Sequence, residues 1–169
     1  MQRARLTRVA ILAALSLATP VLVGPSLAGD FEGAYVGAGL SAGFSGPFVP
    51  DYEGSAFIGY NWNFGSQVIV GSELDLTVNP KSMWVGAATT STIDARLGFL
   101  ASDAVMVYGR AGGGYTTGGV GSYVWDFGLG AEYMMNNGLS LRGEFDRVDP
   151  FEVGMDTQMN GRLGVVMNF

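Results

Sequence analysis

The stretch YVWDFGLGAEYMM, residues 123–135, decides the fold because its side chains change character at every second position. One set of positions carries Tyr123, Trp125, Phe127, Leu129, Ala131, Tyr133 and Met135, and the other carries Val124, Asp126, Gly128, Gly130, Glu132 and Met134. The first set is uniformly apolar, whereas the second mixes glycine with carboxylates. This alternation predicts a β-strand with two chemically different faces.

The same alternation recurs along the chain and predicts an all-β protein of eight strands. The predicted strands cover residues 34–44, 55–64, 67–78, 92–99, 105–115, 123–135, 139–146 and 158–169. The second, fourth and sixth are followed by short breaks, the first of which, Gly65-Ser66, predicts a two-residue type II′ turn. The other breaks are longer. Short turns at one end and longer loops at the other are typical of an up-and-down, antiparallel transmembrane β-barrel with both termini in the periplasm.

The start of the chain has the features of a secretory signal. Three arginines precede an apolar run over residues 9–17, and small residues follow at 26–28. This pattern predicts a cleavable signal peptide over residues 1–28 and a barrel domain over residues 29–169. The alternative is an uncleaved transmembrane helix, but the apolar run is about half of the ~20 residues that a helical span needs.

The charge balance limits the partners. Cleavage at residue 28 would remove three of the nine Lys and Arg residues and none of the fifteen Asp and Glu residues. Nucleic acid is therefore not an expected partner, because a strongly acidic chain offers no basic surface to displace counterions from phosphates.

The alternation alone also fits a soluble barrel such as a lipocalin, in which the apolar face points inward. Three features favour the inverted arrangement: glycine crowds the polar face, the chain has one lysine, and the outer aromatic residues gather at strand ends. The predicted aromatic girdles are Phe44, Tyr115, Tyr123, Trp125 and Phe145 at one end, and Tyr60, Trp62, Phe64, Phe99, Tyr133 and Phe169 at the other. Two such girdles are expected at the two interfaces of a membrane.

The ionisable residues within the predicted strands all share the polar face. They are Glu73, Asp75, Asp94, Arg96, Arg110, Asp126, Glu132, Arg142, Glu144, Asp146 and Arg162. In a narrow barrel this face lines the lumen, where charges are stable only when they are paired. We therefore predict an ion-pair network that fills the lumen. Seven acids against four arginines leave an acidic excess.

Eight segments, in this order, resemble the opacity-like, Omp25/Omp31-type outer-membrane porin family, which belongs to the OmpA-like superfamily of eight-stranded barrels. They are GAYVGAGLSAGF, FIGYNWNFG, VGSELDL, ARLGF, YGRAGGGY, FGLGAEYMM, LRGEFDRVD and GRLGVVMNF. The resemblance implies insertion into the outer membrane of a Gram-negative bacterium, with lipid and lipopolysaccharide as surroundings. It also implies that Leu163, Val165, Met167 and Phe169 form a C-terminal assembly signal that the barrel-assembly machinery recognises. Periplasmic chaperones are expected as further partners before the chain is inserted.

Catalysis is not expected. Glu73 with Asp75, and Glu144 with Asp146, have a spacing that could mimic a glycosidase pair, but pairing with lumen arginines is the stronger interpretation. Outer-membrane lipid A deacylases and omptin proteases need a histidine, and the chain has none. The absence of histidine and cysteine also leaves no imidazole or thiolate ligand for a metal or haem, so no cofactor is expected.

The sequence therefore predicts a structural outer-membrane barrel that contributes to envelope integrity. The alternative is a narrow porin-like channel for ions or very small solutes. Acidic residues in the first and last loops could bind a divalent cation, but an ordinary solvated acidic rim is the stronger interpretation. They are Asp51, Glu53, Asp149, Glu152 and Asp156.

Overall fold

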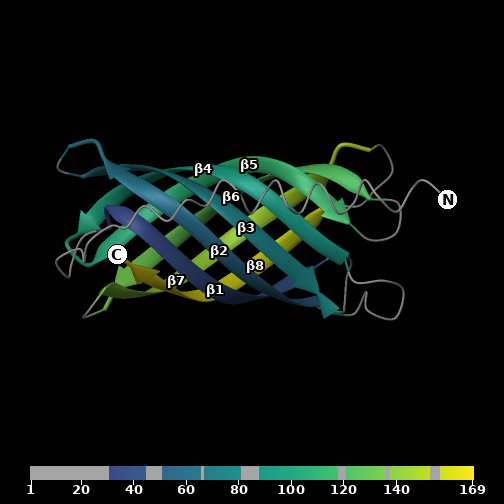
Figure 1. Cartoon of the computed structure of the whole chain (residues 1–169), viewed down its shortest axis with the longest axis horizontal. Coiled ribbons are helices and arrows are strands. Elements are labelled where there is room, and N and C mark those ends of the chain that lie inside the picture. Colours follow the sequence, from purple (N-terminus) through teal and green to yellow (C-terminus); the bar gives the residue numbers. More distant parts are fainter. Residues whose placement is uncertain are drawn as a thin grey trace.

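The computed structural model describes residues 31–44, 51–65, 67–80, 88–117, 121–135, 138–152 and 157–169. The predicted signal peptide lies outside these residues. The described strands form one closed antiparallel barrel, in which each strand pairs with its sequence neighbours and the first pairs with the last (Figure 1). They are β1 (Gly33–Phe44), β2 (Asp51–Asn63), β3 (Val68–Asn79), β4 (Ala88–Ser102), β5 (Val105–Thr117), β6 (Ser122–Met134), β7 (Leu139–Pro150) and β8 (Gln158–Asn168). The predicted fold class is confirmed.

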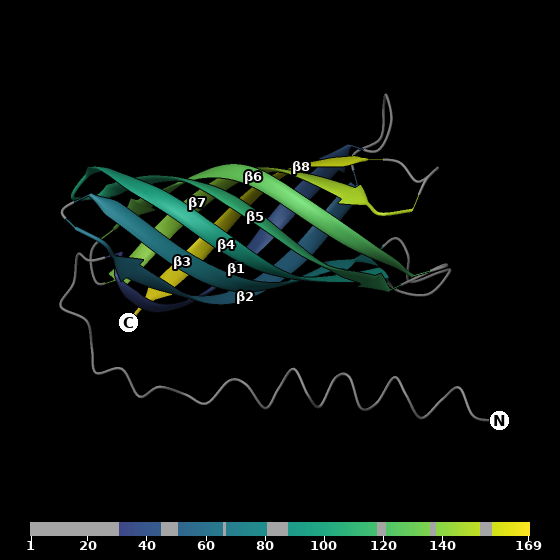
Figure 2. The same ribbon diagram turned by 90° about the horizontal axis from the view of Figure 1, so that it is seen from above.

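The barrel has two distinct ends. Residues 64–67, 103–104 and 135–138 connect strands at one end, which we call the turn end. The strand ends that the longer connections join, including Phe44 and Asp51, Asn79 and Ala88, and Pro150 and Gln158, lie at the other, which we call the loop end. The strands are steeply tilted against the barrel axis, as the two perpendicular views show (Figure 2). Within the described part of the chain, no helix has the length and apolar character needed to cross a membrane.

Several strands extend further toward the loop end than the sequence predicts. β2 begins at Asp51, β4 begins at Ala88, and β7 continues to Pro150. The added residues are rich in polar side chains; for example, the Thr90 and Thr116 hydroxyls lie 2.9 Å apart across β4 and β5. Backbone pairing thus continues beyond the point where apolar alternation stops, and the alternation was the signal that set the predicted bounds.

The predicted two-residue turn at Gly65-Ser66 is wrong. Asn63 pairs with Ile69, and the Phe64 amide donates a hydrogen bond to the Val68 carbonyl at 2.8 Å, so three residues rather than two separate the last hydrogen-bonded positions. Gly65 has a φ of 108°, a conformation that favours glycine. The glycine was a correct turn signal, but the length of the turn depends on the strand register, which the sequence does not show.

The apolar face lies outside the barrel. Leu40, Leu129 and Leu163 are each more than 70% exposed. The inner face carries buried charged and polar side chains instead. This distribution is the reverse of that in a lipocalin-type soluble barrel and matches a barrel that is surrounded by lipid.

The outer aromatic residues lie mostly near strand ends. Tyr60 and Trp62 contact each other near the turn end, with ring centroids 4.9 Å apart, and Tyr115 contacts Tyr123 near the loop end at 5.1 Å. Phe145 is an exception, because it lies in the middle of β7 opposite Leu129. Its predicted place in a girdle rested on β7 ending at residue 146, and that bound is wrong. The side chain of Phe44 lies outside the described residues.

Candidate functional site in the barrel lumen

The structure places all eleven ionisable residues that were predicted for the lumen on the inner face. They come from β3 to β8, and each residue is at most 8% exposed. The alternation along each strand is the cause, since every second side chain must point inward. The inner side chains form three layers along the barrel axis: an apolar floor at the turn end, a central network of charges, and a polar chamber toward the loop end.

The centre of the network is a pair that crosses the lumen. Arg142 on β7 donates a hydrogen bond from Nη1 to Oε2 of Glu73 on β3 at 2.5 Å. The same arginine contacts Glu132 through Nε at 3.1 Å, and Glu132 also accepts a hydrogen bond from the Ser140 hydroxyl. Because β3 and β7 stand opposite each other in the barrel, this pair spans its interior.

Aromatic side chains are part of the same layer. Tyr35 donates a hydrogen bond to Glu73 at 2.8 Å and accepts one from Arg96 at 2.7 Å. The guanidinium carbon of Arg96 lies 4.0 Å from the centroid of the Tyr108 ring, and that of Arg142 lies 4.3 Å from the Phe57 ring. These stacked arrangements favour a buried guanidinium group through cation–π attraction.

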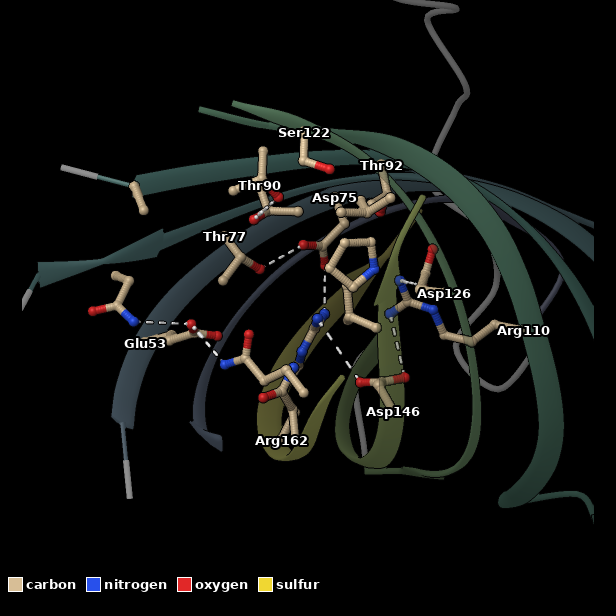
Figure 3. A pocket seen from close by; sticks show the side chains of 18 of the residues that line it. Glu53, Asp75, Thr77, Thr90, Thr92, Arg110, Ser122, Asp126, Asp146 and Arg162 are labelled. Atoms are coloured by element: carbon tan, nitrogen blue, oxygen red, sulfur yellow. Dashed lines mark hydrogen bonds and ion pairs between the residues drawn. The ribbon is translucent and has the colours of Figure 1, made fainter. Parts of the chain in front are cut away.

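Two further arginines lie closer to the loop end. Nη2 of Arg110 donates hydrogen bonds to Asp94 at 2.7 Å and to Asp126 at 3.0 Å. Arg162 donates to Asp75, and its Nη1 lies 3.4 Å from Oε2 of Glu144. Each arginine therefore joins carboxylates from different strands, as the dashed lines in Figure 3 show for Arg110 and Arg162.

The predicted acidic excess is present in this network, and some carboxylate oxygens have no hydrogen-bond donor. They include Oδ1 of Asp126 and both side-chain oxygens of Asp146. The nearest guanidinium nitrogens of Arg110 and Arg162 lie 3.9 Å from Asp146, beyond hydrogen-bond length. An ion-pair interaction remains at that distance, but the lone pairs of these oxygens stay available.

The apolar floor at the turn end was not predicted. Phe31, Ile69, Met106 and Met134 form a buried cluster with Tyr108. A sequence signal did exist, because Ile69, Met106 and Met134 occupy inward positions of the alternation. Their apolar character breaks the polar pattern of that face near the turn end, which indicates a place where the interior is dry.

Glycines on the inner face make room for the large side chains. A Cβ atom on Gly130 would collide with the Tyr108 ring, and one on Gly59 would collide with the Tyr35 ring. The glycine-rich polar face therefore follows from the packing of aromatic rings inside a narrow barrel.

A polar chamber lies between the charged network and the loop end, with a volume of about 230 Å³. Its inner boundary includes Arg110 and Arg162, and its outer boundary includes strand-end residues such as Asn79 and Pro150. Threonine and serine hydroxyls line the wall between them (Figure 3). Sequence reasoning did not predict this chamber.

The geometry gives little support to catalytic chemistry at the carboxylate pairs. Glu73, Asp75 and Glu144 all contact arginines inside the barrel. Among the described residues, no group of three acidic side chains is arranged to hold a metal ion. Of the acidic residues considered for a divalent cation, Asp51 and Glu53 lie in β2 and Asp149 lies in β7 rather than in loops, and Asp156 lies outside the described residues. Asp149 pairs with Arg147 at 2.8 Å.

The four residues of the predicted assembly signal, Leu163, Val165, Met167 and Phe169, all lie on the outer face. They follow one another at every second position, the first three in β8 and Phe169 directly after it, with exposed fractions from 41% to 75%. Their recognition by assembly machinery stays a prediction.

Comparison with known proteins agrees with this architecture. The model of the outer membrane protein beta-barrel domain matches residues 9–169. The chain belongs to this family. Among curated proteins, the 31 kDa outer-membrane immunogenic protein of Brucella melitensis biotype 1 is 27% identical over 124 residues, which are 56% of this chain and 52% of that protein. The chain thus spans about half the length of the curated relatives that it matches, and the resemblance to Omp31-type proteins is confirmed.

Two solved structures have a similar β-barrel fold. The N-terminal β-barrel domain of Pseudomonas aeruginosa OprF superposes with a TM-score of 0.61 at 17% identity, covering 82% of this chain and 98% of that one. The attachment invasion locus protein Ail of Yersinia pestis gives a TM-score of 0.59 at 14% identity, covering 82% and 100%. At these identities the two structures show the fold alone.

Proposed function

We propose that this outer-membrane barrel is a structural component of the envelope whose lumen is closed to solutes. The observation that carries the proposal is the cross-lumen contact of Arg142 with Glu73, set within a network of buried ion pairs. Below it, the apolar floor adds a second closed layer. Water and ions need an open polar path to cross a barrel; the charged side chains of the first layer are buried against one another, and the second layer is apolar.

Planar-bilayer recording of the purified, folded protein tests this proposal. A closed barrel leaves the current at the level of the bare membrane, whereas steady openings would support the alternative of a narrow channel for ions or very small solutes. A cellular test is the loss of the gene, which should make the envelope more permeable to a large hydrophilic antibiotic. Unchanged permeability would argue against a role in envelope integrity.

The proposal includes an orientation, with the turn end and both termini in the periplasm and the loop end outside. The short connections at one end and the long ones at the other support it, because outer-membrane barrels share this asymmetry. The partners that we propose are outer-membrane lipid and lipopolysaccharide around the barrel, with periplasmic chaperones and the barrel-assembly machinery during its insertion.

A further inference from the structure

The polar chamber near the loop end has the size of a small-molecule site. Its volume of about 230 Å³ compares with roughly 30 Å³ for each molecule of liquid water. The chamber therefore has room for a solute of several non-hydrogen atoms. Asn79, Ala88 and Pro150 line it at the ends of their strands, so a solute would enter from the loop end.

Two carboxylates on its wall have acceptor atoms that no protein donor satisfies. Oδ1 of Asp126 and both side-chain oxygens of Asp146 lack a hydrogen-bond partner, although the residues are only 3% and 2% exposed. Three nitrogens of the two arginines that line the chamber also lack an acceptor, namely Nε and Nη1 of Arg110 and Nε of Arg162. In Figure 3 the two carboxylates lie on either side of the Arg110 guanidinium and border the chamber. A buried polar atom without a partner is costly, so the carboxylate oxygens favour a ligand that donates hydrogen bonds, and the arginine nitrogens favour one that also carries an acceptor such as a hydroxyl.

The charges around the chamber specify a cation. Four carboxylates line it, and two guanidinium groups oppose them: Glu53, Asp75, Asp126 and Asp146 against Arg110 and Arg162. The two arginines already contact Asp75, Asp94, Asp126 and Glu144. The remaining negative potential attracts a positive solute and repels an anion.

The wall is better suited to an ammonium group than to a bare metal ion. Among the described residues, no three acidic side chains converge as metal ligands. Asp126 and Asp146 are instead diagonal neighbours on β6 and β7, since Asp146 pairs with Gly128. Diagonal positions lie about 7–8 Å apart, which lets one group with several N–H donors reach acceptors on both. The hydroxyls of Thr77 and Thr92 supply further polar contacts on the wall.

We propose that the loop-end chamber binds a small organic cation that carries a primary ammonium group, with the carboxylate oxygens of Asp126 and Asp146 that lack a protein donor as its acceptors. The inference is independent of whether the barrel conducts, because it concerns only the loop-end half of the lumen. Ethanolamine hydrochloride is a suitable probe. Ethylene glycol is its neutral counterpart of nearly equal size, with a hydroxyl in place of the ammonium group.

The test is an NMR titration of the full chain, folded in a non-ionic detergent. Ethanolamine should shift the amide signals of Thr92, Asp126 and Asp146 in a saturable way, and ethylene glycol at the same concentration should not. Equal shifts from both compounds, or no saturable shift, would show that water alone satisfies these oxygens and would overturn the proposal. Displacement of ethanolamine by an equal concentration of potassium or magnesium chloride would also overturn it, in favour of an inorganic ion.

Single substitutions test whether Asp126 and Asp146 themselves bind the ammonium group. Asp126→Asn and Asp146→Asn should each weaken ethanolamine binding about tenfold or more, because each removes a charge-assisted hydrogen bond. Asp149→Asn is the matched control, since it removes one carboxylate that pairs with Arg147 and does not line the chamber. Unchanged affinity in both chamber variants would overturn the assignment. If a chamber variant does not fold, the comparison of ethanolamine with ethylene glycol on the unaltered chain still tests the proposal.

Discussion

Arg142 and Glu73 meet across the full width of the barrel, with Nη1 and Oε2 separated by 2.5 Å. The two residues are on β7 and β3, which share no backbone hydrogen bonds. Their side chains therefore connect opposite walls that the sheet itself links only around its circumference. Both side chains are almost completely buried, so this contact has little competition from water.

Arg142→Ala should lower the free energy of unfolding by about 3–5 kcal/mol, because it leaves Glu73 and Glu132 buried without their nearest cation. Urea titration of the folded protein in lipid vesicles measures the change. Arg147→Ala is the control, since the Arg147 side chain is 41% exposed and its pair with Asp149 should contribute about 0–1 kcal/mol. Similar losses of unfolding free energy in the two variants would show that the buried Arg142–Glu73 pair stabilises the protein no more than an exposed ion pair does.

The two closed layers of the lumen should act independently as barriers to ions. Widening the apolar floor with Ile69→Ala and Met106→Ala should leave the barrel closed, because the charged layer remains. Arg142→Ala alone should also leave it closed, because the floor remains. Only the triple variant should show steady current in planar bilayers. If Arg142→Ala alone conducts as well as the triple variant, the floor is no barrier.

Gly130→Ala should destabilise the barrel by about 1–3 kcal/mol, since its Cβ atom would collide with the ring of Tyr108. Gly109→Ala provides the control, because a Cβ there meets nothing closer than 3.8 Å. Unfolding midpoints of both variants in urea give the comparison. Equal stability would mean that the Tyr108 ring has room to move away.

A charge on the outer face should cost more in the middle of a strand than at its end. Leu129 lies mid-strand on β6, 72% exposed, and Leu129→Arg should destabilise the folded protein by about 2–4 kcal/mol in a bilayer. Tyr123→Arg, near the loop end of the same strand, should cost about 0–1 kcal/mol. Equal losses of stability at the two positions would contradict a bilayer whose midplane lies near Leu129.

The chain has no cysteine, so single cysteines can report which end of the barrel faces outward. Phe151→Cys, just after β7 at the loop end, should react with a membrane-impermeant maleimide on intact cells. Ser102→Cys, at the turn end of β4, should react only after the outer membrane is permeabilised. The reverse labelling pattern would invert the proposed orientation.

The architecture could be predicted because alternation with a period of two identifies both the strand and its faces. The charges then identified the inner face, since Asp126 and Glu132 could not face lipid. Strand ends were harder to predict, because the residues around Thr90 and Thr116 pair without an apolar face. The misplacement of Phe145 followed directly from the shortened β7.

The contacts within the lumen were beyond prediction for a different reason. Glu73 and Arg142 were both assigned to the interior, but their pairing depends on the stagger of strands around the barrel. That stagger is the sum of every register between neighbouring strands, and turn lengths such as the one after Gly65 alter it. The chamber likewise depends on which side chains leave space, and composition alone does not reveal that.

The pairing of β1 with β8 joins Tyr35 to Asn168 and Phe44 to Met159, near opposite extremes of the described chain. Every other pairing is a hairpin between consecutive strands. Ring closure is therefore the step with the largest entropic cost, and it completes the hydrogen bonding of both edge strands at once. Until it happens, those edges remain exposed to other chains. The barrel should consequently fold in an all-or-none manner, with the seam between its first and last strands closing last.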